Sequence, residues 1–367
     1  TRQVFFNDCP VPVENLLSER GNGFKIAVNI LNIGRVKLGA GVLGGCRRVL
    51  SLSLQYANER KQFGVSIGTF GAIQAKLAEM AIQTFTSESL CYRAGQDIED
   101  RIEALIAGGM EMNQAKLKGV EQFAIECAIA KIHGSEVLDY VVDQGVQVYG
   151  GMGYSADVPM EKAYRDARIS RIYEGTNEIN RMLMVGMLLK RAMKGEINIF
   201  EPAMAVSKEL TSIPSFDTVD ATEFFASEKE ILDRLKKVFL MVSGKAAQTF
   251  MNKIEEEQEV MMNLADIMIE IYAAESVLLR AEKLVLVNGE ESTKSQIAMA
   301  RVYLSEAVDK INIAAKEAIG AFVTGDEQKV MLMGLKRFTK SDLLNTKKLR
   351  REIAEYMLEK GKYTFFI

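Results

Sequence analysis

Apolar residues recur at three- and four-residue spacing through most of this chain, which is the period of amphipathic helices. From Gly23 to about residue 60 this period continues for roughly nine turns or more. It also predicts long helices over residues 72–106 and 112–147, a short helix over 159–168, and a helix that ends near residue 194. The pattern therefore predicts an all-α fold in which residues 23–194 form an antiparallel bundle of four principal helices.

A second group of amphipathic helices is expected in the C-terminal part of the chain. Four or five helices are predicted over residues 226–367, with breaks at the segments NGEEST, VTGDE and RFTKSD. Residues 195–225 contain prolines and show little periodicity, so they are predicted to form a linker. The sequence thus predicts a second helical domain that follows the bundle as a C-terminal extension.

Only the first residues have a strand-like pattern. Val4, Phe5 and Phe6 precede a segment punctuated by proline, as expected of a strand and its exit. A single strand is not stable alone, so we expect its partner strands to lie N-terminal to residue 1. Residues 1–22 are therefore interpreted as a fragment that retains one β-strand.

Charge and cysteine content exclude several classes of function. The 46 basic residues nearly balance the 49 acidic ones, which gives no indication of a nucleic-acid partner. The four cysteines are far apart, and His133 is the only histidine, which argues against a metal site or a Ser-His-Asp triad. We expect reduced thiols in the core of a cytoplasmic protein, with no signal peptide and no transmembrane segment.

Two segments could contact a ligand, although each also has a purely structural explanation. The loop QVYGGMGY follows a helix and not a strand, so it is no Rossmann fingerprint; it either caps the helix or brings bare backbone close to a phosphate. In NERKQFG, Arg60 either complements a helix C-terminus or holds a pyrophosphate, beside Phe63 that could stack on a base. Arg35 lies in an apolar stretch, where a charge is normally paired or faces a groove.

The segment RIYEGTNEI places the carboxylate of Glu174 directly before a Gly-Thr break and a new helix. An acidic residue in that position ordinarily complements the positive end of the helix dipole. The alternative is a carboxylate that performs acid–base chemistry.

Taken in order, LNIGR, NERKQFG, QVYGGMGY and RDARISRIYEGTNEI resemble the acyl-CoA dehydrogenase family. The resemblance covers residues 1–194, which would be the end of the family's middle β domain and its whole C-terminal helical domain. The C-terminal extension resembles the very-long-chain branch. The resemblance further implies that the chain is N-terminally truncated relative to the family.

The resemblance implies a flavin-dependent reaction in fatty acid β-oxidation. Glu174 would remove the α-proton of a long-chain acyl-CoA while the β-hydrogen leaves as hydride to N5 of FAD, which gives a trans-2-enoyl-CoA. The thioester carbonyl would be held by the Glu174 N–H and a ribityl hydroxyl of FAD. Gly175 would leave room for the thioester and Tyr173 would border the acyl chain, while Asn32 and Arg35 would line the CoA groove.

The resemblance also implies residues that bind FAD. Thr176 and Glu178 would contact the FAD of the same subunit. The adenosine-pyrophosphate half of a neighbouring subunit's FAD would be held by Arg60, Phe63, Gln147, Gly150 and Gly151, with Phe70 as a further contact. The family resemblance therefore implies a homodimer or a dimer of dimers, with an electron-transferring flavoprotein as partner.

Two other functions stay open at this stage. An acyl-CoA oxidase would use the same carboxylate and flavin but pass electrons to oxygen. A non-catalytic helical module for oligomerisation or assembly could retain the same motifs. The resemblance also leaves open whether this piece is active without the parts that would precede it.

Overall fold

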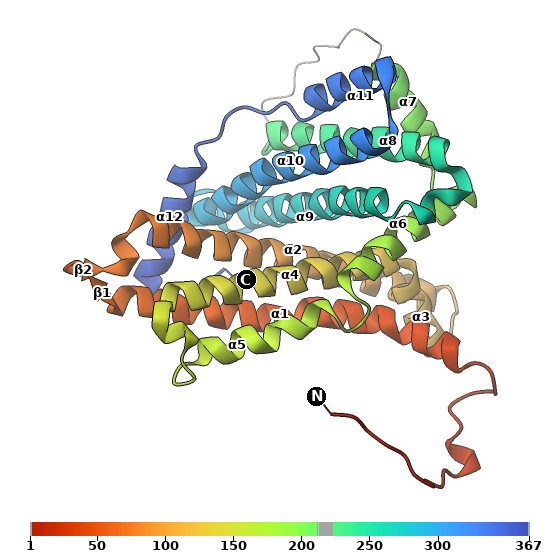
Figure 1. Ribbon diagram of the computed structural model, residues 1–367, viewed down its shortest axis with the longest axis horizontal. Helices are drawn as coiled ribbons and strands as arrows, with labels where there is room; N and C mark the ends of the chain where they lie inside the picture. The colour runs from red at the N-terminus through yellow and green to blue at the C-terminus, as the bar shows by residue number, and fades with distance from the viewer. Residues whose placement is uncertain (1, 211, 213–222, 366–367) are drawn as a thin grey trace.

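The computed structural model describes residues 2–210, 212 and 223–365, and the described part is almost entirely helical (Figure 1). This confirms the predicted all-α fold class. The strand predicted at Val4, Phe5 and Phe6 is wrong for this chain: these side chains are exposed and the segment forms no ladder. No other described segment lies alongside to supply hydrogen bonds, and an isolated strand is unstable.

The first two helices of the bundle are α1 (Gly23–Glu59) and α2 (Gly71–Ala107). A short antiparallel hairpin of β1 (Lys61–Gln62) and β2 (Val65–Ser66) joins them, followed by the 3-10 turn η2 (Ile67–Thr69). Its two-residue turn, Phe63 and Gly64, has positive φ at both positions, as a type I′ turn requires.

The helix predicted over residues 112–147 is divided in two. Phe123, with φ −101° and ψ 29°, separates α3 (Met112–Gln122) from α4 (Ala124–Tyr149). A small separate core packs α3 against α2 beside this break. Its buried members are Ile98, Ile102, Ala115 and Cys127.

The two long helices α1 and α4 meet at glycines. A Cβ atom added at Gly39 would lie 2.7 Å from the carbonyl oxygen of Ala130, and one added at Gly134 would lie 3.1 Å from the Cα of Gly39. The backbones are therefore in direct contact, which explains glycines that would weaken an isolated helix.

The end of the bundle is built from short elements. After α4 come the 3-10 turn η3 (Gly150–Tyr154), helix α5 (Pro159–Ala167) and the 3-10 turn η4 (Arg168–Arg171). Helix α6 (Asn177–Met193) then crosses from the bundle towards the C-terminal extension (Figure 1).

The predicted linker over 195–225 is partly helical. Helix α7 (Phe200–Leu210) forms there because Ala203 and Val206 are buried, with Ala203 close to Gly244. Residues 211 and 213–222 of the predicted linker lie outside the described residues. The other elements of the extension are α8 (Ala226–Phe250), η5 (Met251–Glu256), α9 (Gln258–Asn288), η6 (Glu291–Thr293), α10 (Lys294–Phe322), α11 (Gly325–Phe338) and α12 (Thr346–Lys360).

One hydrophobic core runs through both the bundle and the extension. Helices α9, α10 and α12 pack on α2, so the extension lies along the bundle as a second layer (Figure 1). A fully buried carboxylate, Glu88 of α2, joins the layers: it pairs with Arg47 of α1 and, at 3.1 Å, with Arg280 of α9. The hydroxyl of Tyr363 donates to it as well, at 3.0 Å.

The division of the chain into a bundle, a linker and a C-terminal extension stays an interpretation.

Three of the four cysteines are buried, as predicted, and burial raises the pKa of Cys46, Cys91 and Cys127 to about 12. Cys9 is exposed, contrary to the prediction, because it lies in the N-terminal segment that packs on nothing described. By length and composition the stretch Ile26–Glu59 is long and apolar enough to cross a membrane, and 22% of its most apolar 18 residues are buried. Core helices of soluble proteins also meet this criterion of length and composition. The predicted absence of a transmembrane segment stays a prediction.

The Glu88 junction generates a stability prediction. We expect Glu88→Gln to lower the free energy of unfolding by about 3–5 kcal/mol, because Arg280 would lose its buried carboxylate partner. Urea denaturation followed by circular dichroism measures this. The exposed Lys162–Asp166 pair is the control, since Asp166→Asn should change stability by less than about 1 kcal/mol. Equal effects of the two variants would contradict the role assigned to Glu88.

Candidate functional site

The turn before α6 has a backbone conformation that is unusual for a carboxylate residue. Glu174 has φ +59° and Gly175 has φ +81°, so both lie in the left-handed region. For a residue other than glycine this costs roughly 1–2 kcal/mol and is sustained only by the surroundings. Thr176 then caps the helix, its hydroxyl oxygen accepting from the N–H of Ile179 at 3.3 Å.

Three side chains hold this turn through its carbonyl groups. The buried amide of Asn180 donates to the carbonyls of residues 174, 175 and 176 at 3.3, 2.8 and 3.0 Å. Arg35 of α1 donates to the Glu174 carbonyl at 3.3 Å, and Lys131 of α4 donates to the Gly175 carbonyl at 2.8 Å. The strained turn is thus fixed from two helices of the bundle and from α6 itself.

Arg35 is buried and paired, as its position in an apolar stretch indicates. Besides the Glu174 carbonyl, it donates to the side-chain oxygen of Asn32 at 3.0 Å. Burial lowers the pKa of its guanidinium, while Cys127 and Glu174 act in the opposite direction. Asn32 therefore orients Arg35, and the contact of either residue with CoA stays a prediction.

The Glu174 carboxylate lies against the bare backbone of α1. A Cβ atom at Gly34 would come within 2.4 Å of the Glu174 Oε2 atom, so only glycine permits this arrangement. The carboxylate borders a groove of about 360 Å³. The other residues that line the groove are Gly34, Leu38, Gly41, Val42, Gly45, Leu138 and Tyr173.

Within the described part of the chain the amide N–H of Glu174 donates to no backbone carbonyl, while the carbonyl of the same residue is held by Arg35 and Asn180. One residue thus presents both a carboxylate and a hydrogen-bond donor beside the same groove. Tyr173, about half exposed, forms part of the wall.

The residues expected to bind FAD fall into two groups at different places on the bundle. The first group comprises Arg60, Phe63 and Phe70, where α1 passes into α2, together with Gln147, Gly150 and Gly151, at the end of α4. The stacked rings of Tyr56 and Tyr149, with centroids 4.0 Å apart, bring these two helix ends together.

The second group consists of Thr176 and Glu178, which lie beside Glu174. The 25 residues of helix from Arg35 to Arg60 separate the two groups by roughly 37 Å, so one chain does not gather them into a single site.

In the first group, Phe63 is 92% exposed and its backbone has a φ of +54°. Its ring contacts the Phe70 ring edge-on, with the ring centroids 6.2 Å apart. Gly150 has φ +60° and ψ −140°, and its N–H donates to the Gln147 carbonyl. Gly150 is therefore the C-cap of α4, as the structural interpretation of this segment predicts, but its ψ differs from that of the left-handed αL cap. Its contact with a phosphate stays a prediction.

At the second group, Glu178 lies in the first turn of α6. Its own backbone N–H and the Thr176 hydroxyl hold the pKa of its carboxyl below the usual value. This is the helix-dipole arrangement that an acidic residue ordinarily makes at this position. A contact of Glu178 with FAD is untested.

Comparison with known proteins agrees with these features. Residues 21–189 match the family model described as acyl-CoA dehydrogenase, C-terminal domain, and residues 234–337 match a second model with the same description. The chain belongs to the acyl-CoA dehydrogenase family.

Two curated members and one solved structure are similar over almost the whole chain. A probable acyl-CoA dehydrogenase of Bacillus subtilis is 40% identical over 99% of this chain, which covers 61% of that protein. The mitochondrial very long-chain specific acyl-CoA dehydrogenase of Rattus norvegicus is 30% identical over 94% of this chain, and 52% of that protein is covered.

The solved structure is a crystal structure of an acyl-CoA dehydrogenase complexed with FAD from Bacillus anthracis. It has 43% identity and a TM-score of 0.91, and it matches 96% of this chain and 60% of that chain. This chain therefore spans between half and two thirds of the length of these family members.

The sequence analysis missed two residues that hold the turn, Lys131 of α4 and Asn180 of α6. Lys131 is a charge inside the apolar stretch AIAKIHG, which is the same signal that indicated Arg35, so it could have been found. It is fully buried, and burial lowers its pKa to about 8. Asn180 sits one turn after the helix start and carries no comparable signal.

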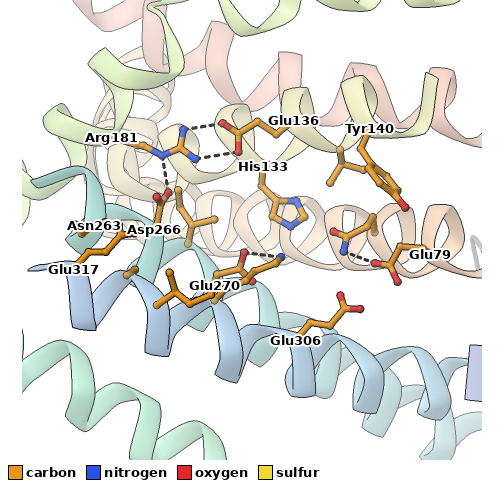
Figure 2. Close-up of a pocket in the computed structure, with 16 residues that line it drawn as sticks. Glu79, His133, Glu136, Tyr140, Arg181, Asn263, Asp266, Glu270, Glu306 and Glu317 are labelled. Atoms are coloured by element: carbon orange, nitrogen blue, oxygen red, sulfur yellow. Dashed lines mark hydrogen bonds and ion pairs between the residues drawn. The ribbon is translucent and has the colours of Figure 1, made fainter. Parts of the chain in front are cut away.

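A second cavity, of about 570 Å³, lies between the family's helical bundle and the extension (Figure 2). Its walls come from α2, α4, α6, α9 and α10, and most of its charges are paired across it. Within the described residues no group of His, Cys, Asp and Glu side chains could hold a metal ion. The sole histidine, His133, is buried there with its Nε2 atom 3.1 Å from the Tyr303 hydroxyl.

His133 generates a prediction for the pH dependence of stability. Burial, with Lys310 and Arg181 adding to it, lowers its pKa to about 3, whereas an unfolded histidine titrates near about 6.5. Between these values the unfolded state binds more protons, so His133 makes stability fall as pH drops below about 6.5. From pH 6.5 to 5 its share should be roughly 2 kcal/mol.

Urea unfolding at pH 5, 6 and 7.5 of the wild type and His133→Gln measures this share. The difference in unfolding free energy between the two proteins should change with pH, because no other histidine contributes. A difference that stays constant over this range would contradict the prediction.

Proposed function

We propose that the protein to which this chain belongs is an FAD-dependent acyl-CoA dehydrogenase in which Glu174 removes the α-proton of the substrate. The placement of Glu174 carries the proposal: its carboxylate packs on Gly34 and its N–H lies in the same braced turn beside a groove. The names of the similar proteins support the same reaction class.

The groove suits an acyl chain that ends in a thioester. Leu38, Val42 and Leu138 supply apolar walls, and the glycines of α1 leave room beside them. A thioester carbonyl that accepts from the Glu174 N–H is polarised, which makes the α-hydrogen more acidic. The Glu174 carboxylate then takes that proton while the Cα–H electrons form the new double bond to Cβ.

FAD, when bound, supplies the acceptor for the hydride that leaves Cβ. The described residues fit such a group: exposed Arg60 and the glycine loop at residues 150–151 offer a cation and open backbone, and Phe63 offers an exposed ring. Because these lie roughly 37 Å along α1 from Glu174, they would serve the cofactor of a neighbouring subunit. This supports a homodimer, or a dimer of dimers.

The substrate and acceptor belong to the same proposal. The similarity to a very long-chain specific enzyme continues through the extension, which supports a long acyl chain and a role in fatty acid β-oxidation. An electron-transferring flavoprotein is proposed as acceptor. A cytoplasmic location is proposed on the free thiols of the described residues.

The first test is Glu174→Gln in the longer protein that the family resemblance implies. We expect FAD to be retained, with its visible spectrum little changed, while bleaching of the flavin by a long-chain acyl-CoA slows by about 10²–10⁴-fold or is lost. Hydrogen peroxide formed without an added acceptor would favour the oxidase alternative. A wild-type protein that binds FAD and is never bleached by acyl-CoA would contradict the proposal.

The second test is Gly34→Ala, which places a methyl group where the Glu174 carboxylate lies. The carboxylate must move, so we expect kcat to fall by about 10-fold or more with FAD retained. Gly44→Ala on the same helix is the matched control, because a Cβ atom there meets nothing within 4 Å. Equal kcat values in the two variants would argue against the assigned position of the base.

A further inference from the structure

A series of polar contacts leads from the catalytic turn to the extension. It begins at Lys131, whose ammonium donates to the Gly175 carbonyl at 2.8 Å and to the side-chain oxygen of Asn177 at 2.6 Å. Lys131 and Asn177 are both buried, so this part of the series is shielded from water.

Asn177 connects Lys131 to Glu136, because its amide nitrogen donates to the Glu136 Oε1 atom at 2.9 Å. The same amide group exchanges hydrogen bonds with the Ser135 hydroxyl, which fixes its orientation. Asn177 thus has acceptor and donor both committed, one towards the turn and the other towards the acidic side chain.

Arg181 joins Glu136 to the extension. Its guanidinium donates to both Glu136 oxygens, at 2.7 and 3.0 Å, and its Nε–H donates to Asp266 of α9 at 2.7 Å. Figure 2 shows Arg181 between the two carboxylates at one end of the second cavity. A bidentate pair of this kind fixes direction as well as distance.

We propose that helix α9 of the extension positions the turn that carries Glu174, through Asp266, Arg181, Glu136, Asn177 and Lys131. The inference rests on the proposed function, since it concerns how the base is held. None of these five residues lines the groove beside Glu174. Each therefore acts through the next residue, and the series of contacts ends where Lys131 donates to the Gly175 carbonyl.

The charges explain why the series acts as a unit. Lys131 is a buried cation, and the charged groups that face it are Glu136, Glu178 and Glu174, against Arg35. Glu136 sustains its charge most strongly, and Arg181 fixes Glu136 in place. Loss of Asp266 frees one edge of Arg181 and loosens Glu136, which weakens the hold of Lys131 on a turn that is strained on its own.

The test compares Asp266→Asn with Glu275→Gln. Glu275 is a matched control on the same helix: it also pairs with the neighbouring layers, through Arg93 at 2.7 Å and Lys236 at 2.8 Å, but does not lead to the turn. We expect Asp266→Asn to raise amide hydrogen exchange at Tyr173, Ile179 and Asn180, whose N–H groups are hydrogen-bonded at or beside the turn. We also expect it to lower the rate of flavin reduction by about 2- to 30-fold. Glu275→Gln should change neither, and KM and FAD retention should be unaltered in both.

Coupling is tested with Lys131→Met and the double variant. If the residues act as one unit, Lys131→Met slows flavin reduction more than Asp266→Asn does, and the double variant is no slower than Lys131→Met alone. Additive losses in the double variant would overturn the proposal. Unchanged exchange at the turn in Asp266→Asn would overturn it as well.

Hydrogen exchange separates this proposal from the proposed function. It is measured on the chain itself and needs no FAD or substrate. A wild-type protein whose flavin is never reduced by acyl-CoA would overturn the function. The exchange difference between Asp266→Asn and Glu275→Gln would still decide whether α9 positions the turn.

Discussion

The contact between the backbones of α1 and α4 at Gly39 and Gly134 is the constraint on which the rest of the site depends. Arg35 lies one helical turn before Gly39, and Lys131 lies just before Gly134, so the crossing brings both cations beneath the turn at Glu174. A methyl group at the crossing would push the helices apart and separate the cations from the carbonyls that they hold. The distance between the helices therefore fixes the position of the carboxylate.

The helices were predictable from the sequence because their period continues over many turns. Gly23 begins α1 as predicted, and Gly289 ends α9 at the predicted break. The prediction failed where long-range contacts decide the outcome. The strand at Val4 needed a partner, and α7 forms only because Ala203 has the neighbouring helix α8 to pack on.

The candidate site was predictable in identity but not in arrangement. Four motifs in order indicated Glu174, Arg35, Arg60 and the loop at Gly150, yet their order along the chain says nothing about distance in space. The structure places Arg60 and Gly150 together and Glu174 far from both. Contacts with FAD and CoA remain predictions, because the residues assigned to them were inferred only from the resemblance of their motifs to the family.

The series of contacts from Lys131 to Asp266 passes from a dry region to a wet one. Lys131 is fully buried, whereas the side chains of Glu136 and Asp266 are 39% and 44% exposed. Dissolved ions screen exposed charges over about 8 Å at physiological ionic strength but act little on buried ones. Salt is therefore expected to weaken the partly exposed ion pairs of Glu136 and Asp266 more than the contacts of buried Lys131, so the outer half of this connection should respond to the ionic composition of the solvent and the inner half should not.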